Sequence, residues 1–160
     1  MSEARKVDAR TLFAKAYEYQ MQGQLDEAVA MYKRSIELDP TAEAHTFLGW
    51  AYSFLGRYEE AIAECKRAIA IDPEFGNPWN DIGAYLIEMG RDDEAIPYLE
   101  RATQARRYES PCFPHFNLSR IYTKKGMLHK AGDELKKALV ANPEYTVAQE
   151  ALDNLETQLQ

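Results

Sequence analysis

Cysteine is scarce in this chain of 160 residues, and the features that accompany secretion or membrane insertion are missing. Only Cys65 and Cys112 are present, which excludes a framework of several disulfides and favours a reducing compartment. The N-terminal segment 1–13 is charged and lacks the apolar core of a secretory signal, and no apolar run is long enough to cross a bilayer. We therefore expect a cytoplasmic protein without a membrane partner.

Basic residues are also in the minority. The chain has 19 Lys and Arg against 26 Asp and Glu, and its formal net charge is −7. Binding to nucleic acid or to an anionic membrane draws on a basic surface, because phosphate groups must be neutralised. The charge balance therefore argues against a nucleic-acid partner and against a membrane surface.

The motifs of common catalytic sites are missing too. The sequence contains no H-E-x-x-H, no G-x-S-x-G and no Walker-type glycine loop. Cys112-x-x-His115 has the spacing of two metal ligands, but a zinc site needs further ligands, so chance spacing is the favoured interpretation. We expect a protein that is not an enzyme and that uses no metal and no cofactor. A metal-dependent or thiol enzyme built on Cys112 and His115 is the least favoured alternative.

What the sequence does contain is a repeat. Four glycines recur at intervals of 33, 34 and 36 residues: Gly23, Gly56, Gly90 and Gly126. A small residue stands seven positions before each glycine: Ala16, Gly49, Gly83 and Ser119. An alanine stands five positions after each one: Ala28, Ala61, Ala95 and Ala131. A period near 34 predicts a solenoid of helical hairpins, in which glycine makes the turn and small residues let the helices cross closely.

These residues resemble the tetratricopeptide-repeat (TPR) family. The second unit carries the family pattern most fully, in Leu48, Gly49, Tyr52, Gly56, Ala61, Ala68 and Pro73. The resemblance covers roughly residues 9–143 and is weakest in the fourth unit. It implies an all-α fold, a right-handed α-α superhelix (solenoid) of about four TPR helical hairpins plus a C-terminal capping helix.

The expected organisation is a single TPR domain over residues 1–160. Its repeats are expected at about 9–41, 42–75, 76–111 and 112–143, with a capping helix at 144–158. The third repeat lacks a closing proline and ends in a longer linker, 106–111, which we interpret as a loop insertion rather than a functional loop. The last helix has one apolar and one polar side, so we expect it to cover the end of the solenoid; its alternative role is to bind a partner.

The resemblance also implies that the first helix of each hairpin lines a concave groove that holds ligands. It places aromatic side chains in the N-terminal half of the groove: Phe13, Tyr17, Phe47, Trp50 and Phe54. It places polar side chains in the C-terminal half: Asn80, Asp81, Asn117, Arg120 and Lys124. Aromatic side chains anchor buried partner groups, asparagine can bond a partner's main chain, and arginine can meet a carboxylate through two hydrogen bonds. The alternative for Phe47 and Trp50 is packing between helices.

One subclass of the family holds the acidic C-terminal tails of cytosolic chaperones with Lys, Asn and Arg side chains. The matching positions here are Phe13, Tyr17, Asn77 and Asp81, so the basic clamp is missing. Asp81 would repel a carboxylate at this place. We therefore reject a chaperone-tail adaptor of that type.

The sequence thus predicts a non-enzymatic protein–protein interaction scaffold or adaptor whose groove binds a peptide or helix of a partner. The alternative is an assembly factor of a larger complex, of the secretion or pilus type, or a scaffold that self-associates weakly. Fold alone does not choose between them, because TPR grooves share a scaffold and differ in what they hold.

Overall fold

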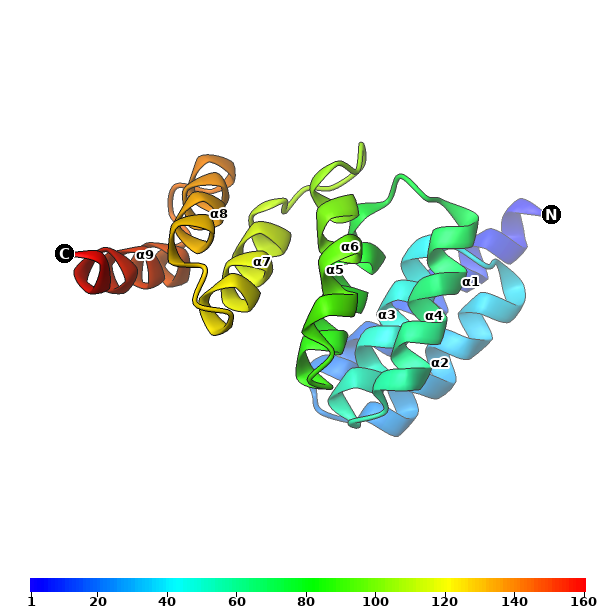
Figure 1. The fold of residues 1–160 in the computed structure, drawn as a ribbon. Helices are drawn as coiled ribbons and strands as arrows, with labels where there is room; N and C mark the ends of the chain where they lie inside the picture. Colours follow the sequence, from blue (N-terminus) through cyan, green and yellow to red (C-terminus); the bar gives the residue numbers. More distant parts are fainter.

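The structure is a computed structural model that describes residues 1–160, and it contains nine α-helices and no sheet (Figure 1). The helices are α1 (Glu3–Met21), α2 (Leu25–Leu38), α3 (Ala42–Phe54), α4 (Tyr58–Ile71), α5 (Gly76–Glu88), α6 (Asp92–Thr103), α7 (Cys112–Lys124), α8 (Leu128–Ala141) and α9 (Thr146–Leu159). The first eight pair into four hairpins, α1–α2, α3–α4, α5–α6 and α7–α8. The all-α solenoid expected from the repeat is confirmed. None of the helices combines the length and apolar composition that crossing a bilayer requires.

Each hairpin turns at one of the four spaced glycines. Their φ angles are 77°, 74°, 75° and 74° at Gly23, Gly56, Gly90 and Gly126. This left-handed conformation is disfavoured for residues with a Cβ, so glycine is the residue that fits. The next residue closes the helix end, as where the Gln24 N–H donates to the Tyr19 carbonyl oxygen at 2.9 Å. The four spaced glycines therefore mark the C-terminal ends of the first helices of the four hairpins.

Small residues bring the two helices of a hairpin close together. A Cβ added to Gly49 would lie 2.9 Å from the Ala61 carbonyl oxygen, and one added to Gly83 would lie 2.3 Å from a side-chain carbon of Leu99. The alanines of the second helices are fully buried: Ala28, Ala61, Ala95 and Ala131. Since protein interiors are packed as densely as organic crystals, larger residues at these crossings would force the helices apart.

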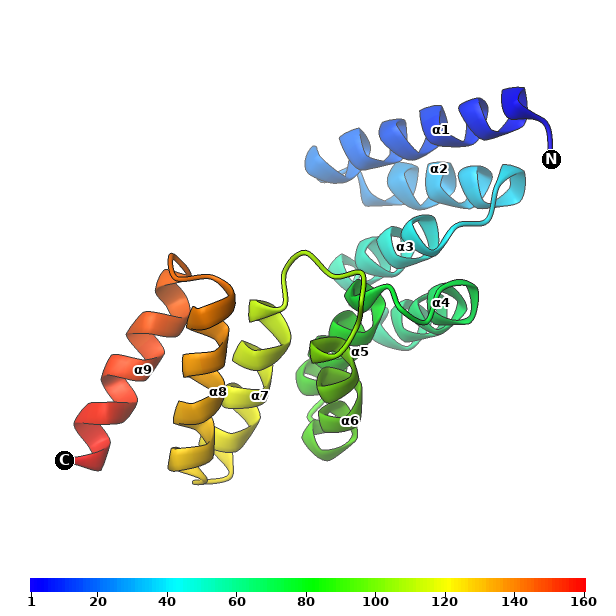
Figure 2. The same ribbon diagram turned by 90° about the horizontal axis from the view of Figure 1, so that it is seen from above.

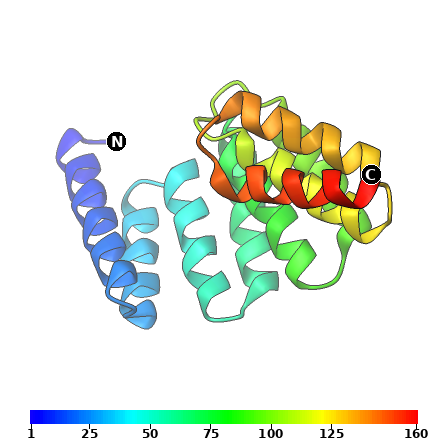
Figure 3. The same cartoon turned by 90° about the vertical axis from the view of Figure 1, so that its left-hand side faces the viewer.

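Successive hairpins stack along an arc, and the first helices lie towards its inner side (Figure 2). On that side α3 contacts α5, and α5 contacts α7. The buried core runs continuously from Ala16 to Leu155 rather than gathering around one centre. At the far end α9 packs on α8 and buries Ala148, Leu152 and Leu155 (Figure 3). Each hairpin therefore buries its apolar side chains against the adjacent hairpins, which is typical of a solenoid.

The linker between α6 and α7 folds back onto the start of α5. The Arg107 N–H donates to the Glu74 carbonyl oxygen at 2.9 Å, and the Gly76 N–H donates to the Arg107 carbonyl oxygen at 3.0 Å. The ring of Tyr108 lies against Gly76, where an added Cβ would approach the ring to 2.5 Å. Residues 106–108 of the linker are therefore attached to the start of the third hairpin.

The side chain of Arg107 fastens this linker to the second hairpin as well. Its guanidinium lies 2.8 Å from a carboxylate oxygen of Glu43 and 2.8 Å from one of Asp72. It also covers the ring of Phe75 at 4.1 Å from the ring centroid. The interpretation of this segment as a plain loop insertion misses these contacts, which tie residues far apart in the sequence.

Candidate functional site

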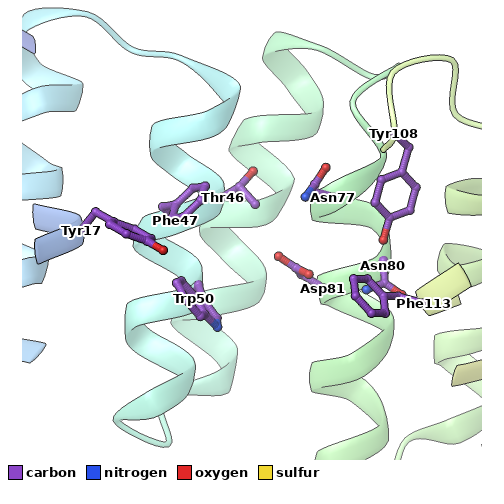
Figure 4. A pocket seen from close by; sticks show the side chains of 9 residues that line it. All are labelled: Tyr17, Thr46, Phe47, Trp50, Asn77, Asn80, Asp81, Tyr108 and Phe113. Atoms are coloured by element: carbon purple, nitrogen blue, oxygen red, sulfur yellow. The ribbon is translucent and has the colours of Figure 1, made fainter. Parts of the chain in front are cut away.

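A pocket of about 350 Å³ opens on the inner side of the arc, and we call it the central pocket. Its walls come from α1, α3, α5, the α6–α7 linker and α7 (Figure 4). It is lined by Tyr17, Thr46, Phe47, Trp50, Asn77, Asn80, Asp81, Tyr108 and Phe113. The volume is in the range of pockets that hold small ligands or partner side chains, about 300–1,000 Å³.

The N-terminal wall of the central pocket is a row of aromatic side chains. The ring of Phe47 lies 5.1 Å from that of Phe13, 6.1 Å from that of Tyr17 and 5.7 Å from that of Trp50, all edge to face. Trp50 in turn lies 5.2 Å from Phe54. Edge-to-face contacts of this kind hold aromatic rings in fixed orientations. The row therefore presents a preformed surface rather than a set of independent side chains.

The members of this row differ in how much surface they leave free. Phe13 and Phe47 are half-buried and pack against the hydrophobic core, Phe13 also reaching Tyr32 at 5.5 Å. Tyr17 and Phe54 are 43% and 58% exposed. Packing and exposure thus divide the row: its base belongs to the core, and its outer members have aromatic surface to offer a partner.

The opposite side of the central pocket carries a carboxylate. Asp81 on α5 points into the pocket, below Asn77 and beside Asn80 (Figure 4). Burial raises the pKa of Asp81 to about 7, and the amide of the adjacent Asn80 offsets part of this rise. The surroundings therefore disfavour the charged form of this carboxylate as long as no cation accompanies it.

Two buried asparagines connect α5 with α7. The side-chain amide of Asn117 donates to the Asn80 side-chain oxygen at 3.0 Å. Arg120 donates to the Asn117 side-chain oxygen at 3.1 Å. These bonds satisfy amide groups that would otherwise be costly to bury. Asn80 and Asn117 consequently serve the contact between the third and fourth hairpins, and only Asn80 also lines the central pocket.

The two cations predicted for the C-terminal half of the groove already have carboxylate neighbours. Arg120 lies 3.5 Å from Glu88, and Lys124 lies 3.3 Å from Asp92. Both pairs join α7 to the third hairpin. An incoming partner carboxylate would therefore have to compete with an acidic group of the protein itself.

The ten predicted groove residues do not form one site. Five of them meet in the central pocket: Tyr17, Phe47, Trp50, Asn80 and Asp81. Phe54 stands next to Trp50, and Phe13 faces a smaller pocket towards α2. Arg120 and Lys124 line a different pocket of about 360 Å³, between α7 and α9.

Four residues of the central pocket are not among the ten predicted groove residues: Thr46, Asn77, Tyr108 and Phe113. Asn77 and Phe113 stand six positions before the small residues Gly83 and Ser119, so the repeat register contains a signal for both. Tyr108 lies in the linker outside the repeat register. Only the folding of the linker onto α5 brings it to the pocket.

The residues considered for metal or thiol chemistry are engaged elsewhere. His115 Nδ1 lies 2.7 Å from a carboxylate oxygen of Glu134, within the fourth hairpin. Cys112 is buried, and this burial raises the pKa of its thiol. No three His, Cys, Asp or Glu side chains gather as a metal site would require.

Comparisons with known proteins find the tetratricopeptide repeat along most of the chain. Three models of this repeat match residues 13–74, 55–110 and 114–145. A search of curated proteins finds no match.

Solved structures of the same fold cover nearly the whole chain. PilF of Pseudomonas aeruginosa superposes with a TM-score of 0.90 at 22% identity, over 98% of this chain and 71% of that one. PilW, a widely conserved type IV pilus biogenesis factor, gives a TM-score of 0.84 at 21% identity, over 99% and 71% of the two chains. YrrB, a TPR protein with an unusual peptide-binding site, gives 0.69 at 24% identity, over 94% and 77%. At these identities the likeness establishes the fold.

Proposed function

Because the chain belongs to the tetratricopeptide-repeat family, we propose that it is a non-enzymatic scaffold that binds a segment of a partner protein in its central pocket. The observation that carries this proposal is the pocket itself, in which five of the residues expected to bind a partner come together. The use of the same fold for peptide binding by YrrB supports it.

The aromatic wall supplies the affinity in this proposal. Tyr17 and Phe54 are exposed, and Trp50 is half-buried in the wall of the pocket. Covering such surface with a partner's apolar side chain is favourable by about 25 cal/mol per Å². Because the rings are held by Phe47 and Phe13, little side-chain freedom is lost on binding.

The remaining predicted residues take supporting roles. Asn80 and Asn117 hold the third and fourth hairpins together beneath the groove, and Arg120 and Lys124 line the separate pocket between α7 and α9. We treat residues 1–160 as one interaction domain with repeats at about 9–41, 42–75, 76–111 and 112–143. In this scheme α9 covers the end of the stack.

A pull-down from the source lysate with three baits tests the proposal. The baits are the wild type, Tyr17→Ala/Trp50→Ala and Arg120→Ala/Lys124→Ala, each checked for retained helicity by circular dichroism. We expect a partner that the wild type and the Arg120/Lys124 variant capture and the Tyr17/Trp50 variant loses. If all three baits capture the same proteins, the groove is not the binding surface.

An assembly factor is the second candidate. The likeness of the whole chain to PilF and to the pilus biogenesis factor PilW favours it. We place it second because a similarity at 21–22% identity establishes a shared fold and not a shared role. Its self-associating version is tested by light scattering over a range of concentrations, and a strict monomer would remove it.

A further inference from the structure

The central pocket contains an acidic group that no basic group of the protein accompanies. Asp81 takes part in none of the protein's ion pairs, whereas the two cations of the concave face on α7 do, Arg120 with Glu88 and Lys124 with Asp92. The titratable groups that interact electrostatically with it are Cys65 of α4, Tyr85 of α5 and Tyr108 of the linker, and Tyr17 of α1 also lines the pocket; none of them is a cation.

Aromatic side chains stand on both sides of this carboxylate. Tyr17, Phe47 and Trp50 lie on the side of α1 and α3, and Tyr108 and Phe113 lie on the side of α7 (Figure 4). The face of an aromatic ring attracts a cation within about 6 Å, and the attraction grows when the cation is removed from water. Between these aromatic walls an ammonium or guanidinium group is therefore stabilised both by the carboxylate and by the faces of the rings.

The same geometry disfavours other occupants. A carboxylate of a partner would be repelled by Asp81, and the protein's net charge of −7 adds to this repulsion at a distance. A purely apolar side chain would cover Asp81 and remove its remaining water without replacing it, which is costly for a polar group. A basic side chain is the occupant that satisfies both the carboxylate and the rings.

Resting on the proposed function, we infer that the central pocket selects a lysine or arginine side chain of an extended partner segment, with Asp81 as its counter-ion and Trp50 as the principal aromatic contact. Apolar residues next to this basic residue in the partner then lie on the exposed surfaces of Tyr17 and Phe54. The pocket thereby sets the sequence preference, and the aromatic row around it supplies further affinity.

A selection from a displayed library of random short peptides tests this inference. The targets are the wild type, the isosteric variant Asp81→Asn, the groove variant Trp50→Ala, and Glu100→Gln. Glu100 is exposed on α6, away from the concave face, so Glu100→Gln is a control that removes the same charge as Asp81→Asn. We expect the wild type and Glu100→Gln to enrich peptides with lysine or arginine at one position among apolar residues. Asp81→Asn should lose most of this preference and keep only the part that the aromatic rings contribute.

An enriched peptide is then synthesised with its basic residue and with glutamine in that place, and both are titrated against each protein. We expect the glutamine exchange to weaken binding to the wild type about tenfold or more, and to weaken binding to Asp81→Asn by no more than about two- to fivefold, the part that the rings alone contribute.

The outcomes distinguish failure of the cation preference from failure of peptide binding. Peptides that need Trp50 but show no basic residue, or a basic residue whose exchange weakens both proteins equally, would overturn the selection of a cation and leave peptide binding in the groove standing. Failure of the wild type to enrich any peptide over Trp50→Ala would overturn the proposed function together with this inference.

Discussion

The concave face presents two regions of different character. The central pocket holds a carboxylate without a cation and aromatic rings with free surface, whereas α7 carries two cations that each lie beside an acidic side chain. Arg120 and Lys124 are the more conspicuous charges in the sequence, yet their interactions are already made within the protein. A group can contribute to binding a partner mainly when its interactions are unmade in the free protein. Asp81 and its aromatic neighbours are therefore the groups of this face with interactions left to offer a partner.

The largest effect on stability is expected from Asp81→Asn, and it depends on pH. As pH rises from the ordinary carboxyl value of 3.8 to about 7, the unfolded chain releases the Asp81 proton while the folded chain retains it, so the wild type loses stability over this interval. Asparagine does not titrate. Above about pH 7 the variant should be more stable by about 2–4 kcal/mol, and near pH 3 the difference should disappear.

Urea unfolding of both proteins at acidic and mildly alkaline pH measures this difference. Glu100→Gln serves as the control, because that carboxylate is exposed on α6. An equal stability difference between Asp81→Asn and the wild type at all pH values would show that Asp81 is not poorly solvated.

The second prediction separates packed from free members of the aromatic row. Phe13 is half-buried against Tyr32 and Phe47, so Phe13→Ala should lower the free energy of unfolding by about 2–3 kcal/mol. Phe54 is 58% exposed, so Phe54→Ala should change it by less than about 0.5 kcal/mol. Thermal or urea unfolding of the two variants provides the measurement, and equal losses would contradict the division of the row.

The third prediction concerns the wall that the linker contributes. A Cβ at Gly76 would lie 2.5 Å from the Tyr108 ring, so Gly76→Ala should cost about 1–3 kcal/mol and displace Tyr108 from the pocket. Trypsin should then cleave faster after Arg106 and Arg107. The matched control is Gly132→Ala in α8, whose added Cβ meets its nearest neighbour, Leu155, at an ordinary 3.4 Å. This variant should be neutral or slightly stabilised, since alanine favours helix. Unchanged proteolysis of Gly76→Ala would mean that the linker stays attached to α5 in spite of the added Cβ.

The smallest effect is expected on α7. The pairs of Arg120 with Glu88 and of Lys124 with Asp92 lie partly in solvent, and such pairs contribute about 0–1 kcal/mol. Arg120→Ala and Lys124→Ala should each lower stability by less than about 1 kcal/mol, and added salt should reduce the difference further. Urea unfolding at low and high ionic strength measures the loss of stability. A larger loss that does not depend on salt would indicate that these ion pairs are shielded from solvent.

Much of the fold could be predicted from short-range features of the sequence. The four glycines predicted the four turns. Each turn needs one residue in the left-handed conformation, and glycine adopts this conformation most easily. The small residues at constant distances from these glycines predicted the close helix crossings seen at Gly49 and Gly83. The resemblance to the family, applied to this register, placed the first helices on the inner side, and five of the residues chosen on that basis line the central pocket.

The sequence by itself therefore determined the repeat and the turns, since both depend on sterics and periodicity within one hairpin, and the inner faces followed only from the resemblance to the family. Only the tertiary structure decided which inner-facing groups remain free. Arg120 meets Glu88 and Lys124 meets Asp92 across a hairpin boundary, and Tyr108 reaches the pocket because the linker folds back onto Gly76. Electrostatic pairing and solvent access depend on groups brought together from distant segments, so they are properties of the assembled arc rather than of any single repeat.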